Sequence, residues 1–92
     1  MMFNLGNLIA TKNVYLNMQE SSCFAYDVKN CFEQFKNKNW GDLSEEDWKL
    51  NDLAIKNNDD RILAVYNTCR GRIYIITEED RSVTTILFTD EY

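Results

Sequence analysis

The side chains of this sequence that could act as catalytic groups or metal ligands, by their type and spacing, are carboxylates. The stretch WGDLSEEDW, residues 40–48, holds four acidic residues between two tryptophans, and Glu78-Glu79-Asp80 forms a second acidic run. Two carboxylates can in principle hydrolyse a glycosidic bond or bind a hard cation. Neither run has the ligand spacing of a calcium loop, because no D-x-[DN]-x-[DN]-G pattern occurs. We therefore predict no catalytic residue, no cofactor and no metal site.

Missing residue types exclude further chemistry. The sequence contains no histidine, which removes Ser-His and Cys-His nucleophile pairs, His-ligated zinc and the usual proton shuttle at neutral pH. It also lacks a Walker loop, a G-x-G-x-x-G and a G-x-S-x-G motif. Cys23, Cys31 and Cys69 form no C-x-x-C pair, so we expect reduced, mostly buried thiols. These absences favour a protein that is not an enzyme.

The first acidic run also fits the start of a helix. With Ser44 as N-cap, Asp47 occupies the third helical position and completes a capping box, and Leu43 can pack against Trp48. Carboxylates in the first helical turn are each stabilised by about 0.3–1 kcal/mol by the helix dipole. The acidic run therefore needs no catalytic explanation.

Trp48 leaves two interpretations open. It can pack back on Leu43 and Trp40 and so complete a corner of the core. Alternatively, it can be the centre of an exposed patch beside Glu45 and Asp52, of the kind that anchors a protein interface.

Hydrophobic periodicity predicts the fold. The 92 residues form one domain, 1–92. Alternating and helical patterns predict a strand at 3–11, a short helical or irregular turn at 14–18, helices at 22–36 and 45–57, and strands at 61–67, 72–77 and 83–89. Short connections between the last three strands favour an antiparallel meander. The predicted class is α+β, β-α-α-β-β-β, with the helices packed on one face of the sheet.

Charge and hydropathy indicate the kind of partner. A formal charge of −5 and a pI near 4.6 disfavour direct nucleic-acid binding, because phosphate contacts need clustered Lys and Arg. A basic or neutral protein is a more natural partner. Since the sequence has no apolar window of membrane-spanning length and no basic, apolar leader, we expect no membrane association and a cytoplasmic location.

The sequence from Trp40 to Tyr92 resembles a family of small, largely uncharacterised bacterial proteins carried on plasmids, prophages and other mobile elements. The resemblance lies in the pattern GDL…ED…ND, RIL…Y, IITE.DRS.TT and EY, which here covers Gly41-Asp42-Leu43, Glu46-Asp47, Asn51-Asp52, Arg61-Ile62-Leu63, Tyr66, Ile75-Ile76-Thr77-Glu78, Asp80-Arg81-Ser82, Thr84-Thr85 and Glu91-Tyr92. Asn7 to Thr11, NLIAT, is also similar, whereas Lys12 to Asn39 matches the family poorly.

That resemblance implies a function by analogy, because mobile elements commonly encode small acidic proteins that disable bacterial immunity, such as anti-CRISPR proteins. The hypothesis is a non-enzymatic inhibitor that binds a CRISPR effector or another bacterial defence nuclease and occludes its nucleic-acid-binding surface. The candidate contacts are Trp40, Asp42, Glu45, Trp48, Asp52, Glu78, Glu79, Asp80 and Arg81. The alternative is a small self-associating adaptor or regulatory module of a plasmid or phage, possible as a homodimer, which exposed Ile and Val on an edge strand would favour.

Overall fold

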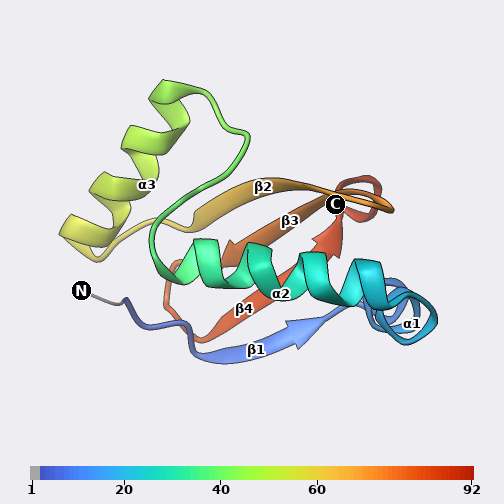
Figure 1. The fold of residues 1–92 in the computed structure, drawn as a ribbon. Helices are drawn as coiled ribbons and strands as arrows, with labels where there is room; N and C mark the ends of the chain where they lie inside the picture. Colours follow the sequence, from blue (N-terminus) through green and yellow to red (C-terminus); the bar gives the residue numbers. More distant parts are fainter. Residues whose placement is uncertain (1–2) are drawn as a thin grey trace.

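A computed structural model describes residues 3–92 and has the predicted α+β class. Figure 1 shows one small domain whose sheet is crossed by a helix. The elements in order are β1 (Asn7–Ala10), α1 (Lys12–Glu20), α2 (Ser22–Lys36), α3 (Glu45–Asn57), β2 (Ile62–Thr68), β3 (Gly71–Thr77), β4 (Val83–Phe88) and the 3-10 turn η1 (Thr89–Glu91). The short turn expected at 14–18 is the full helix α1; the order of the other elements is as predicted.

The sheet is mixed, with strand order β1-β4-β3-β2. Strands β2, β3 and β4 form the predicted antiparallel meander. The first strand, β1, pairs parallel to β4, with Asn7 opposite Val83 and Ala10 opposite Ile86. The N-terminal strand and the end of the meander therefore lie side by side, and β1 and β2 are the two edges.

The main core lies between the sheet and α2. Ala64, Ile75 and Ile86 form a row across β2, β3 and β4 and are nearly inaccessible to solvent. The α2 side chains Phe24, Val28, Cys31 and Phe35 are buried against this face. Their helical spacing produces one apolar stripe, which their burial places on the inner side of the helix. Figure 1 shows α2 lying across the sheet.

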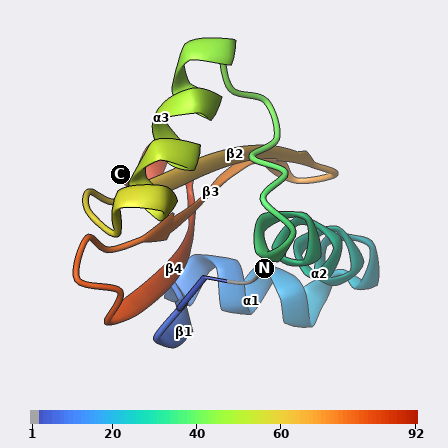
Figure 2. The ribbon, with the colours of Figure 1, turned by 90° about the vertical axis from the view of Figure 1, so that its left-hand side faces the viewer.

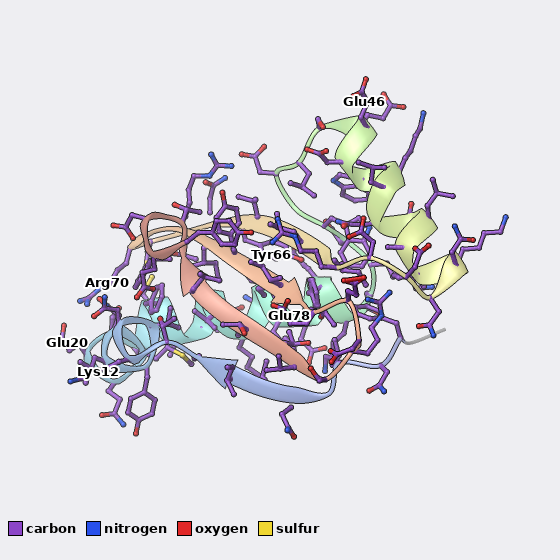
Figure 3. The ribbon with its side chains drawn as sticks, turned by 180° about the vertical axis from the view of Figure 1, so that it is seen from behind. Lys12, Glu20, Glu46, Tyr66, Arg70 and Glu78 are labelled. Carbon is purple, nitrogen blue, oxygen red and sulfur yellow. The ribbon has the colours of Figure 1, made fainter. Side chains whose placement is uncertain are left out.

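The opposite sheet face carries a smaller apolar layer. Val65, Ile76 and Leu87 alternate with the core-facing residues and are also buried. In Figure 3, which shows this face, the strands lie in front of α2. Tyr92 packs edge-on against Tyr74 at 5.6 Å between ring centroids. The C-terminal residues therefore help to cover this layer.

The third helix, α3, stands beyond the β2 end of the sheet (Figure 2). Ser44 caps it as predicted, because its hydroxyl accepts the backbone N–H of Asp47 at 3.2 Å. The helix ends at Asn57, and the C-cap residue Asn58 takes a left-handed conformation with φ of 51°. Among residues 3–92, no helix is long and apolar enough to cross a membrane.

Candidate protein-binding surfaces

The two tryptophans of the first acidic run build an internal corner. Trp40 is fully buried and packs edge-on against Phe35 at 5.3 Å. Its indole N–H donates to Asp52 Oδ1 at 3.0 Å, and the Trp48 indole N–H donates to the Gly41 carbonyl at 3.2 Å. Trp48 is half-buried against the core. This arrangement matches the packed interpretation of Trp48 and leaves Trp40 with no surface for a partner.

The same corner closes the β2 edge of the sheet. Val65 N–H donates to the Trp40 carbonyl at 3.2 Å, and Asp42 N–H donates to the Val65 carbonyl at 2.7 Å. The buried Asn51 side chain pairs with both backbone groups of Leu63, donating to the carbonyl at 2.9 Å and accepting from the N–H at 3.2 Å. Two of the three outward-facing positions of this edge, Leu63 and Val65, are therefore satisfied from within the chain, and the third is the exposed Asn67 near the β2–β3 turn.

The close approach at this corner requires a glycine. Gly41 has φ of +76°, and a Cβ atom there would lie 2.0 Å from the Val65 carbonyl oxygen. Any side chain would thus push the corner off β2.

Two acidic residues near the corner that were predicted to contact a partner are exposed. Asp42 pairs with Arg72 at 3.1 Å, and Glu45 lies 3.7 Å from Lys49. Exposed pairs of this kind contribute little to stability, about 0–1 kcal/mol. Both carboxylates therefore remain accessible to a partner.

Arg81 is an internal clamp. It is only 7% exposed, and its guanidinium donates to the carbonyls of Asp60 at 2.6 Å, Ala54 at 3.0 Å and Asp59 at 3.2 Å. It also donates to the Glu78 and Glu79 carbonyls, both at 3.3 Å. The side chain predicted as a partner contact instead joins the end of α3 to the β3–β4 connection.

This clamp creates an acidic end of the molecule. It holds two exposed acidic turns next to each other, and we use "acidic end" for their carboxylates: Asp59, Asp60, Glu78, Glu79 and Asp80. Two hydrogen bonds from Ser82 lower the pKa of Asp80. The larger effect comes from the Ser82 hydroxyl and the smaller one from its backbone N–H, which donates to Asp80 Oδ1 at 2.9 Å. Glu78 lies at the end of β3 (Figure 3).

The β1 edge is open. Asn7 N–H donates to Ser82 O and Thr11 N–H donates to Ile86 O, both at 3.0 Å. Because backbone groups alternate in direction along a strand, the N–H and C=O groups of Leu8 and Ala10 point away from β4. All four β1 residues are exposed, Leu8 by 49% and Ile9 by 50%.

An apolar groove runs beside this open edge. Its volume is about 320 Å³, and it lies between β1 and helices α1 and α2. Its apolar walls include Leu8, Ala10, Tyr15, Met18, Phe32 and Ile86, and Lys29 is the one charged residue that lines it. Leu8 and Ala10 share the sheet face that α2 covers, which places the groove next to their side chains.

The prediction of mostly buried cysteines is wrong for two of the three. Cys31 is buried, which raises the pKa of its thiol to about 11. Cys23 and Cys69 are exposed, because Cys23 lies off the apolar stripe of α2 and Cys69 is in the β2–β3 turn. The i, i+4 spacing of Cys23 and Asp27 was a readable signal that they share a helix face.

These two thiols lie next to each other. The ligating atoms of Cys23, Asp27 and Cys69 are all within 4.8 Å of one another. Cys69 N–H donates to Asp27 Oδ2 at 2.8 Å. Hydrogen bonding with Cys23, followed by smaller effects of burial and of Asp27, raises the pKa of the Cys69 thiol to about 11.

Fold and surfaces together define a small α+β domain with a mixed four-stranded sheet, one closed edge and one open edge. Comparisons with family models, curated proteins and solved structures find no match for the chain.

Proposed function

We propose that the chain is a protein-binding domain that acts by stoichiometric association, and that its partner adds an extended segment to the β1 edge. The observation that carries this proposal is the outward-facing backbone of Leu8 and Ala10 beside an apolar groove. In strand addition, main-chain hydrogen bonds supply affinity, and pockets for alternate side chains supply specificity. The β1 edge and its groove have both components.

The first candidate partner is a bacterial defence nuclease, in particular a CRISPR effector, whose nucleic-acid-binding surface the domain would occlude. The acidic end adjoins the start of β1, because the Asn7 N–H donates to the carbonyl of Ser82, two residues after Asp80. A strand edge flanked by carboxylates suits a basic, partly apolar segment, and surfaces that bind nucleic acid are basic. The resemblance of residues 40–92 to proteins of mobile elements supports the same partner.

The test is capture of CRISPR effectors by the tagged protein, with a salt titration of the complex. Leu8→Glu should abolish capture, because it places a charge in the groove. The matched control is Leu53→Glu, which changes an equally exposed leucine, 50% accessible, on α3. Neutralising Glu78, Glu79 and Asp80 should weaken capture and flatten its salt dependence. Capture that is unaffected by Leu8→Glu would contradict the proposed surface.

The second candidate partner is another copy of this chain, which makes the domain a self-associating adaptor or regulator. The specific observation in its favour is the pair of half-exposed residues Leu8 and Ile9 on the edge strand. Two β1 edges could pair about a two-fold axis and join two sheets. Light scattering across a concentration series distinguishes the candidates: a dimer lost in Leu8→Glu supports self-association, and a monomer that captures an effector supports inhibition.

A further inference from the structure

We propose that Cys23, Asp27 and Cys69 form a binding site for one borderline-soft divalent cation of the zinc type, which fastens the β2–β3 hairpin to the first turns of α2. This site is independent of the protein-binding surface proposed above. It lies at the opposite end of the sheet from the acidic end, because Cys69 is in the β2–β3 turn and Glu78 follows β3.

The geometry is close to that of a tetrahedral site. Zinc binds thiolate sulfur at about 2.3 Å and carboxylate oxygen at about 2.0–2.2 Å, so neighbouring ligand atoms stand roughly 3.6–3.8 Å apart. In the structure the three ligating atoms lie within 4.8 Å of one another. Side-chain rotations that move each atom by about an ångström would therefore complete the coordination.

The backbone already holds the ligands together. Cys23 and Asp27 are four residues apart on α2 and share one helix face. Cys69 reaches them because its backbone N–H donates to Asp27 Oδ2 at 2.8 Å. This bond leaves the second Asp27 oxygen for a metal and orients the carboxylate as an outer hydrogen bond typically does in metal sites.

A second set of contacts fixes the turn that carries Cys69. Arg70 donates to Asn17 Oδ1 at 2.7 Å and to Glu20 Oε1 at 3.1 Å, which ties the turn to the end of α1 (Figure 3). Within the turn, Thr68 Oγ1 donates to the Gly71 carbonyl at 2.6 Å and accepts the Arg70 N–H at 3.1 Å. A site on restrained elements loses little conformational freedom when a metal binds.

The donor set selects the metal class. Two thiolates and one carboxylate match zinc and its cobalt or cadmium substitutes, whereas magnesium and calcium prefer oxygen ligands alone. On binding, the two thiols release two protons to the solvent and become thiolates. Both cysteines are exposed, so solvent water can take the fourth position.

The probe is Co²⁺, followed by Zn²⁺, titrated into the chelator-treated full chain in a phosphine reductant without thiols. We expect one Co²⁺ per chain, a thiolate-to-cobalt charge-transfer band in the near ultraviolet, and loss of that band when Zn²⁺ displaces cobalt. Metal should also raise the unfolding temperature, because a ligand that binds only the folded state stabilises it. Saturation without a charge-transfer band would overturn the proposal.

Four variants test the ligands. Cys23→Ser and Cys69→Ser should each lower the affinity at least about a hundredfold, since loss of an outer partner alone costs 10–100-fold. Asp27→Asn keeps an acceptor for Cys69 N–H, so it should weaken binding and retain the charge-transfer band. Cys31→Ala, the matched control, removes the buried thiol and should leave stoichiometry unchanged. Wild-type affinity in both serine variants, or a Cys23–Cys69 disulfide that persists in the reductant and blocks the metal, would refute the site.

Discussion

The two edges of the sheet differ in whether their outward-facing backbone groups have hydrogen-bond partners within the chain. At β2, the side chain of Asn51 pairs with Leu63, and the backbone of Trp40 and Asp42 pairs with Val65. At β1, the corresponding outward groups of Leu8 and Ala10 face solvent beside an apolar groove. Natural proteins generally blunt exposed strand edges because such edges pair with other chains. A chain that pairs one edge from within, at Leu63 and Val65, and leaves the other open has a surface suited to pairing at β1.

The closed edge is also tied to the main core. Trp40 supplies both a carbonyl to β2 and a ring that packs on Phe35, and its indole N–H is satisfied by Asp52. Changes at this edge should therefore affect stability, whereas changes at the open edge should affect association. The predictions below test that division.

The largest effect is expected for Trp40→Ala. Removal of a fully buried tryptophan should lower the free energy of unfolding by about 3–5 kcal/mol. Urea unfolding followed by circular dichroism measures it. Trp40→Phe keeps an aromatic ring and loses the N–H to Asp52, so it should cost less. A loss below about 1 kcal/mol for Trp40→Ala would show that the corner contributes little to the core.

The next effect is expected for Asn51→Ala. It removes both hydrogen-bond partners of the Leu63 backbone. Because leaving a backbone donor or acceptor without a partner costs about 1–3 kcal/mol, the free energy of unfolding should fall by about 2 kcal/mol. Amide exchange at Leu63 should also accelerate. Asn57→Ala, at an exposed position of the same helix, is the control and should change stability by less than about 0.5 kcal/mol. Equal effects of the two variants would contradict closure of the β2 edge by Asn51.

Local features of the fold could be predicted from the sequence. The apolar stripe of α2 and the Ser44 cap of α3 depend on residues within a few turns, so periodicity and capping rules locate both helices at the observed bounds. The meander followed from short connections. Parallel pairing of β1 with β4 could not be predicted in this way, because it depends on contacts such as Asn7 with Ser82 between the two ends of the chain.

The candidate sites were harder to predict for a related reason. Trp40 and Arg81 belong to residue types that are enriched at interfaces, but here an aromatic cluster and several backbone carbonyls bury them. Residue type alone does not distinguish these uses. Cys69 meets α2 through a hydrogen bond from its backbone N–H to Asp27, 42 residues away in the sequence, and no local pattern indicates such a contact.

A smaller effect on stability distinguishes two proline substitutions at the open edge. Ile9→Pro removes an N–H that faces β4 and should cost about 1–3 kcal/mol, whereas Ala10→Pro removes an outward N–H and should cost less than about 0.5 kcal/mol. Ala10→Pro should nevertheless weaken partner capture at least about tenfold, since strand addition needs that donor. Urea unfolding and the capture assay measure the two properties. If Ala10→Pro destabilised the fold as much as Ile9→Pro, the assigned direction of the β1 backbone would be incorrect.

The smallest effect concerns the turn at the start of the open edge, where Ser82 lowers the pKa of Asp80 below its ordinary value of 3.8. A lowered pKa in the folded state means that Asp80 contributes stability above its unfolded-state pKa and loses it as the pH falls through the folded-state value. Ser82→Ala should therefore raise the pKa of Asp80, and its stability difference from wild type should vanish in acid.

A carboxyl chemical-shift titration by NMR measures this pKa, and urea unfolding between neutral and acid pH measures the linked stability. Ser22→Ala, at the exposed start of α2, is the control and should leave Asp80 unchanged. An Asp80 pKa that stays low in Ser82→Ala would mean that the hydroxyl is not the main cause. The lowered pKa would then depend on the backbone N–H of Ser82, which the substitution retains.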